Sequence, residues 1–92
     1  MKLAIFQRST SKTRPDAHVI AVSVIGIPQI AYTNHEAQHM MEQIGMILDH
    51  GEGWLTIDFG LHGERRIPHK YANQLVNDLQ IALQAWANYE GS

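Results

Sequence analysis

Residues 54–89 read WLTIDFGLHGERRIPHKYANQLVNDLQIALQAWANY, and this stretch decides the fold class. Over 54–59 the residues alternate between two sides of an extended chain, which predicts a strand with one buried face. Two glycines then bracket a tight connection into a second short strand over 64–67, as in a hairpin. The buried face of the first strand is predicted to carry Leu55, Ile57 and Phe59.

A helix is predicted directly after this hairpin. Pro68 fits its first turn, where the N–H that proline lacks would have no partner within the helix. Apolar residues then recur at helical spacing until about Tyr89. They are Ala72, Leu75, Val76, Leu79, Ala82, Leu83 and Trp86. A hairpin followed by an amphipathic helix indicates the α+β class.

The N-terminal half has a similar plan. Strands are predicted over 2–8 and 18–25, with a short edge segment at 29–32. A second amphipathic helix is predicted from about Asn34, and Gly51 supplies its left-handed cap. The expected fold is therefore a small antiparallel sheet of about four strands with two amphipathic helices, in the order ββαββα.

Size and composition limit the function further. The 92 residues are too few for two hydrophobic cores, so residues 1–92 are predicted to form one domain. The absence of cysteine excludes disulfides, thiolate metal sites and cysteine nucleophiles. No run resembles a signal peptide or a membrane span, so a cytoplasmic location without a membrane partner is expected. The formal net charge of −2 gives no general attraction to nucleic acid.

One motif points to chemistry. His35, Glu36 and His39 spell His-Glu-x-x-His on the predicted helix. At this spacing two histidines can share one Zn²⁺, and the glutamate can act as general base on metal-bound water. The motif is similar to the core motif of zinc metalloproteases, and the resemblance implies a small zinc-dependent hydrolase. A further zinc ligand would be needed, and the candidates are His50, Glu52, His62 and Glu64.

The same motif has a structural interpretation. Thr33 and Glu36 have the spacing of a capping box, in which each side chain accepts a backbone N–H of the other residue. His35 and His39 lie nearly opposite the apolar stripe of the helix, so they are expected to face solvent. We therefore favour capping over catalysis and expect neither a catalytic residue nor a cofactor, with zinc held by His35 and His39 as the alternative.

The second helix has an outward face of uncharged amides, where solvated helices usually carry Glu and Lys. Ile81 lies in the middle of that face. An apolar residue surrounded by amides is typical of a protein contact or of a homodimer helix pair. The predicted contact residues on this face are Asn73, Gln74, Asn77, Gln80, Ile81 and Gln84.

Two basic clusters are the other candidate contacts. Arg65, Arg66 and Lys70 lie where the second hairpin meets its helix, and the other cluster is formed by Arg8, Lys12 and Arg14. If the first strand lay beside the hairpin, the two clusters would form one patch for phosphates or for an acidic protein surface. No aromatic residue is interleaved with either cluster in the sequence, which argues against nucleic acid.

The sequence thus favours a non-enzymatic protein-protein interaction module whose partner is another protein or a second copy of the chain. Small domains of this kind often act as inhibitors, including phage-encoded anti-defence (anti-CRISPR-like) proteins that block a partner surface. A zinc-dependent hydrolase is the second hypothesis. A nucleic-acid binder acting through basic loops is the third.

Overall fold

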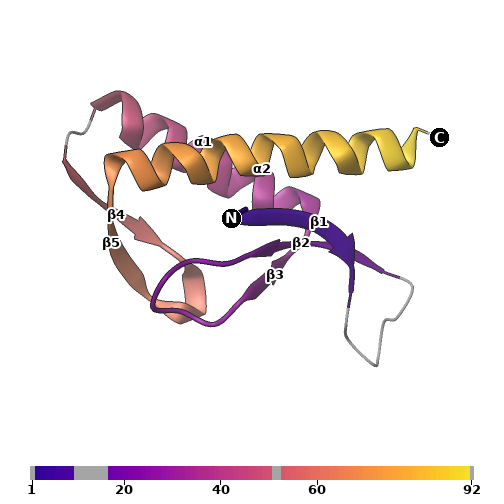
Figure 1. Ribbon diagram of the computed structural model, residues 1–92, viewed down its shortest axis with the longest axis horizontal. Coiled ribbons are helices and arrows are strands. Elements are labelled where there is room, and N and C mark those ends of the chain that lie inside the picture. Colours follow the sequence, from indigo (N-terminus) through magenta and orange to yellow (C-terminus); the bar gives the residue numbers. More distant parts are fainter. Residues whose placement is uncertain (1, 10–16, 51–52, 92) are drawn as a thin grey trace.

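The computed structural model describes residues 2–9, 17–50 and 53–91 (Figure 1). It confirms the α+β class, with two helices and two antiparallel sheets. The elements in chain order are β1 (Ala4–Arg8), β2 (His18–Val22), β3 (Ile30–Tyr32), α1 (Asn34–His50), β4 (Trp54–Asp58), a 3₁₀ turn (Gly60–His62), β5 (Glu64–Pro68) and α2 (His69–Glu90).

The strands divide between two sheets instead of joining in one. The first sheet has the order β1-β2-β3, with Phe6 opposite Ile20 and Ile20 opposite Tyr32. The second is the β4-β5 hairpin. β2 ends at Val22, earlier than predicted, and Gly26 with a φ of 91° then turns the chain out of the extended conformation. β3 is only three residues long because the cap of α1 follows at once.

The helices pack against each other, and α2 also lies along β1. Figure 1 shows α2 crossing the whole molecule, with the hairpin at its N-terminal end. α2 begins at His69 because Pro68 keeps an extended ψ of 149°, so this proline precedes the first turn that it was predicted to occupy. α1 ends at His50, and its predicted cap Gly51 lies outside the described residues.

The core lies between the helices and the inner faces of both sheets. Its fully buried side chains each contribute on the order of 1.5–3 kcal/mol through burial. The largest of them are Ile20, Val22, Ile44, Phe59, Leu75 and Leu79. Asp78 is the one buried charged residue among those described, and it accepts the Leu3 N–H at 2.8 Å. This bond joins the start of β1 to the middle of α2.

Neither helix in the described part of the chain has an apolar stretch of the length that a bilayer crossing needs.

Candidate functional site

The capping box at the start of α1 is confirmed. The Thr33 N–H donates to Glu36 Oε1 at 3.0 Å, and the Glu36 N–H donates to Thr33 Oγ1 at 3.1 Å. Both bonds satisfy backbone donors that a helix N-terminus leaves without partners. The carboxylate of Glu36 is therefore directed toward the backbone of Thr33.

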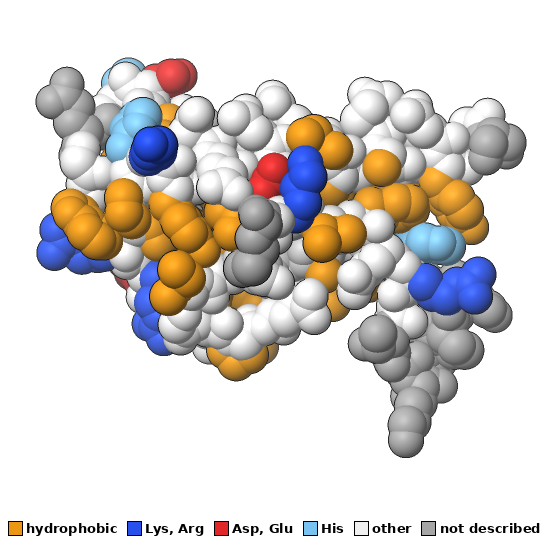
Figure 2. Space-filling view, viewed as in Figure 1, with side chains coloured by type: hydrophobic (Ala, Val, Ile, Leu, Met, Phe, Trp, Pro, Cys, Tyr) orange, Lys and Arg blue, Asp and Glu red, His pale blue; other side chains and the backbone are white. Residues whose placement is uncertain are grey.

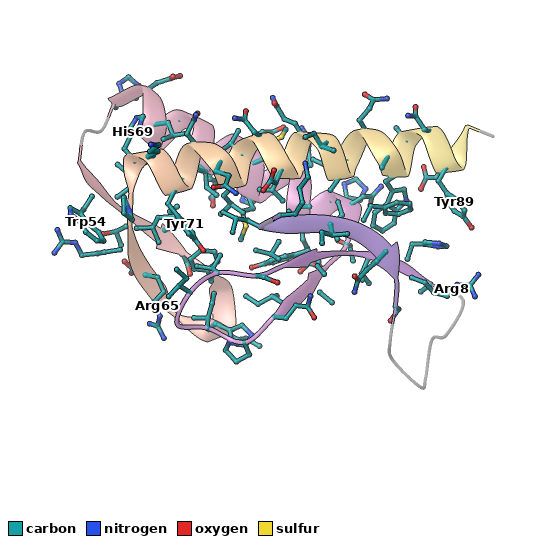
Figure 3. The ribbon with its side chains drawn as sticks, viewed as in Figure 1. Arg8, Trp54, Arg65, His69, Tyr71 and Tyr89 are labelled. Atoms are coloured by element: carbon teal, nitrogen blue, oxygen red, sulfur yellow. The ribbon has the colours of Figure 1, made fainter. Side chains whose placement is uncertain are left out.

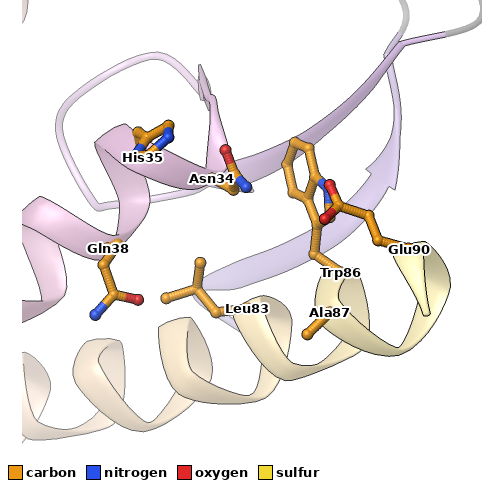
Figure 4. Close-up of a pocket in the computed structure, with 7 residues that line it drawn as sticks. All are labelled: Asn34, His35, Gln38, Leu83, Trp86, Ala87 and Glu90. Atoms are coloured by element: carbon orange, nitrogen blue, oxygen red, sulfur yellow. The ribbon is translucent and has the colours of Figure 1, made fainter.

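The two motif histidines are exposed and line different hollows. The hollow of His35, about 270 Å³, lies between the start of α1 and the last turns of α2 (Figure 4). In its wall, Trp86 Nε1–H donates to Glu90 Oε1 at 2.6 Å. The described residues contain no group of three His, Asp or Glu side chains that could hold a metal ion. Of the candidate ligands, Glu52 lies outside these residues.

The hollow of His39, about 260 Å³, contains a feature that the sequence did not reveal. Tyr32, Glu36 and Asp58 also line it. The Tyr32 hydroxyl is buried and has no hydrogen-bond partner among the described residues. Burial raises the pKa of Tyr32, and the nearby carboxylates of Glu36 and Asp58 raise it further. The hydroxyl therefore keeps its proton at neutral pH.

The predicted contact residues of α2 all lie on one exposed helical face, which we call the amide face. Its members are Asn73, Gln74, Asn77, Gln80, Ile81 and Gln84. Ile81 keeps 55% of its surface exposed. The amide of Gln84 donates to Asn88 Oδ1 at 3.0 Å, one turn further along. Lys70 precedes Asn73 by three residues, so by helical geometry it extends this face toward the hairpin.

The hairpin register places a tryptophan beside the basic residues. Trp54 pairs with Pro68 and Thr56 pairs with Arg66, so all four side chains share the outer face of the hairpin. Trp54 is 61% exposed. In the linear sequence Trp54 is far from this basic cluster. The only sequence feature that pointed to an exposed Trp54 was its position on the outer face of an alternating strand. The expectation that no aromatic residue accompanies the cluster is therefore corrected by the register.

Further apolar surface lies where the loop after β2 meets the first turn of α2. Ile25 is 79% exposed, and its backbone N–H donates to the Tyr71 hydroxyl at 3.2 Å. Arg65 projects from the inner side of the hairpin but is exposed, and it donates to the Glu64 carbonyl. We call this region the hairpin-end surface. Its residues are Ile25, Trp54, Arg65, Arg66, Pro68, Lys70 and Tyr71.

Figure 2 shows apolar side chains at this end of the molecule with Lys and Arg around them, and Figure 3 shows how Trp54, Arg65 and Tyr71 lie. The ion pair found in the described residues joins Lys2 Nζ to buried Asp78 at 3.7 Å. Within that same part of the chain, the cations of the hairpin-end surface thus have no carboxylate partner.

Of the first basic cluster, only Arg8 lies within the described residues, and it does not join Arg65, Arg66 and Lys70. Arg8 lies at the opposite end of the molecule from Arg65 (Figure 3). A single patch would require the first strand to lie beside the hairpin, and it does not. Lys12 and Arg14 lie outside the described residues. Comparison of the chain with protein-family models, curated proteins and solved structures finds no match.

Proposed function

We propose that this chain is a non-enzymatic protein-binding module that uses the hairpin-end surface to occupy an acidic surface of a partner protein. The observation that carries the proposal is the exposed Trp54 beside cations that have no carboxylate partner within the described residues. A small domain that covers a surface of its partner in this way would inhibit the partner by blocking that surface.

The residue types suit a tight contact. Tryptophan, tyrosine and arginine are the residues that most often dominate the binding energy of protein interfaces. Trp54 and Pro68 offer flat apolar area with little side-chain freedom to lose, so burying them costs little conformational entropy. Arg66 and Lys70 add attraction to carboxylates, which speeds encounter and sets the orientation of the partner. The amide face continues from Lys70 as a polar rim.

The charges favour a protein partner over nucleic acid. A strand of nucleic acid needs a basic track with several stacking aromatics. The hairpin-end surface has three cations within six positions of sequence and one mostly exposed indole. Asp58 and Glu64 lie at the other end of the same hairpin face and would repel a continuing phosphate backbone. An acidic protein patch of limited extent fits this surface better.

Trp54 itself can report the interaction. In the Trp86→Phe variant it is the only indole, because the chain has two tryptophans. The emission of Trp54 is titrated with poly-L-glutamate, as a carboxylate surface, and with an oligothymidylate, as single-stranded nucleic acid. We expect a saturable change with polyglutamate that weakens as salt rises, because exposed charges are screened.

Matched variants locate the binding. Arg66→Gln and Lys70→Gln together should weaken polyglutamate binding about tenfold, whereas Arg8→Gln at the opposite end should not. If Arg8→Gln weakens binding equally, the hairpin-end surface is not the site. A stronger response to oligothymidylate than to polyglutamate would replace the proposal with nucleic-acid binding.

A second copy of the chain is the alternative partner, since Ile81 is exposed among amides on the amide face. Native mass spectrometry measures the subunit count directly. A dimer that Ile81→Glu dissociates, while the emission of Trp54 stays unchanged, would assign the amide face to self-association.

A further inference from the structure

β4 has a free edge whose direction follows from two hydrogen bonds. At the ends of the hairpin, the His69 N–H donates to the Gly53 carbonyl at 2.7 Å and the Phe59 N–H donates to the Gly63 carbonyl at 2.9 Å. Bonded and non-bonded pairs alternate in an antiparallel ladder. The pairs formed by Leu55 and Ile57 are therefore bonded, and the N–H and C=O groups of Trp54, Thr56 and Asp58 point away from β5.

These outward groups of β4 have no partner in the described parts of the chain. The free edge of β5 differs, because it carries Arg65, Arg66 and Pro68, and charged residues and proline hinder the addition of a strand. β4 has no basic residue and no proline, and its only charge is Asp58 at one end. β4 is therefore the less protected edge of the hairpin.

A groove runs beside this edge. Its volume is about 470 Å³, within the range of about 300–1,000 Å³ that is usual for ligand sites. α1 contributes Met40, Gln43, Met46 and Ile47 to it, and Met46 is 66% exposed. Methionine side chains adapt to differently shaped apolar partners. Because side chains alternate along a strand, a strand laid along β4 would direct every second side chain toward this groove.

The groove is acidic at one end. Asp58 and Glu64 pair across the hairpin and both line the groove. Neither forms an ion pair with another residue in the described ranges. Asp58 uses Oδ1 to accept the Gly60 N–H at 2.8 Å, which fixes its carboxylate at the mouth of the hairpin turn. The charge complement of this end is a Lys or Arg side chain.

We propose that the β4 edge binds an extended peptide segment by strand addition, with an apolar side chain against Met46 and a basic side chain at Asp58 and Glu64. Main-chain hydrogen bonds to Thr56 would supply affinity, and the alternating side chains would supply selectivity. This surface differs from the hairpin-end surface and has the opposite charge preference, so it defines a second binding function.

The test uses a library of randomised nonapeptides displayed on phage and selected against the full chain. Thr56→Pro is the blocking variant. Because the Thr56 N–H points outward, proline removes no hydrogen bond of the hairpin but obstructs the added strand. Thr56→Val is the matched control, since valine keeps both the N–H and the branched shape. Circular dichroism verifies that both variants fold.

We expect enriched peptides that contain Lys or Arg, that bind Thr56→Val normally and that bind Thr56→Pro at least about tenfold more weakly. N-methylation of alternate backbone positions in a selected peptide should abolish binding, which tests the main-chain bonds without changing the protein. Asp58→Asn combined with Glu64→Gln should remove the preference for basic peptides.

Three outcomes would overturn the proposal. They are a selection without enrichment, peptides that bind Thr56→Pro as well as the parent chain, and binding that survives N-methylation in both alternating registers. Self-association that Thr56→Pro abolishes would assign the edge to a second copy instead of a peptide.

Discussion

The two tryptophans lie at opposite ends of the molecule and have different surroundings. Trp86 packs on Phe6 with ring centroids 5.2 Å apart, and its indole N–H bonds to Glu90. Phe6 in turn contacts His18 and Tyr89, whose rings also contact each other. Trp54 has no aromatic contact within the described residues and is mostly exposed. The same residue type thus stabilises the fold at one end and is available for binding at the other.

The two helix N-termini show the same contrast. α1 starts near Trp86, and the capping box of Thr33 and Glu36 satisfies its first donors. α2 starts at the hairpin end after Pro68, with no side-chain cap and no acidic residue in its first turn. The positive end of its helix dipole adds to the field of Arg66 and Lys70. The His69 N–H at this end is bonded to the Gly53 carbonyl, and the positive charge that remains is what an acidic partner would complement.

The largest effect on stability is expected from Trp86→Ala. Loss of a half-buried indole and its aromatic contacts should lower the free energy of unfolding by about 2–3 kcal/mol. Urea denaturation measures this change, and Trp86→Phe should recover most of it because the contact with Phe6 remains. If Trp86→Ala were as mild as Trp54→Ala, the contrast between the two ends would be wrong.

The second largest loss of stability is expected from replacing Asp78, in the middle of α2. Asp78→Ala leaves the Leu3 N–H without its acceptor, which costs about 1–3 kcal/mol. Asp78→Asn keeps an acceptor and should lose less. Lys2→Ala should change stability by less than about 1 kcal/mol, since the ammonium group is exposed. Equal losses in Asp78→Asn and Asp78→Ala would show that the hydrogen bond to Leu3 does not carry the effect.

Thr33→Ala tests the capped helix end and should cost about 1 kcal/mol. Glu36→Gln should nearly preserve stability, because the amide oxygen can still accept the Thr33 N–H. Thermal unfolding of both variants compares the two halves of the capping box. Zinc-dependent hydrolysis by the parent chain that Glu36→Gln abolishes would instead establish a catalytic role for this glutamate.

Trp54→Ala should have the smallest effect on stability, within about 0.5 kcal/mol, because the side chain is mostly exposed. The same change should weaken polyglutamate binding about tenfold. Isothermal titration calorimetry measures binding in this variant, which lacks the fluorescent reporter. A large stability loss with unchanged binding would make Trp54 a structural residue like Trp86.

Local pattern was sufficient to predict most of the fold. Alternation over 54–59 identified β4 and its buried face, and the Thr33 and Glu36 spacing identified the cap of α1. The division into two sheets was not predictable, because it depends on which strands pair across long sequence separations. The basic residues Arg65, Arg66 and Lys70 were predicted as contacts, but the tryptophan beside them was missed. Trp54 and Arg66 are brought together only by the register of the hairpin.

The long helix α2 holds the two ends of the molecule at a fixed distance from each other. Its 22 residues span about 33 Å, so the two ends are well separated along one rigid element. The chain contains no cysteine, and Arg8 is exposed at the end that lacks the hairpin. Arg8→Cys therefore provides a single thiol for immobilising or labelling the protein with the hairpin and its groove left open to solution.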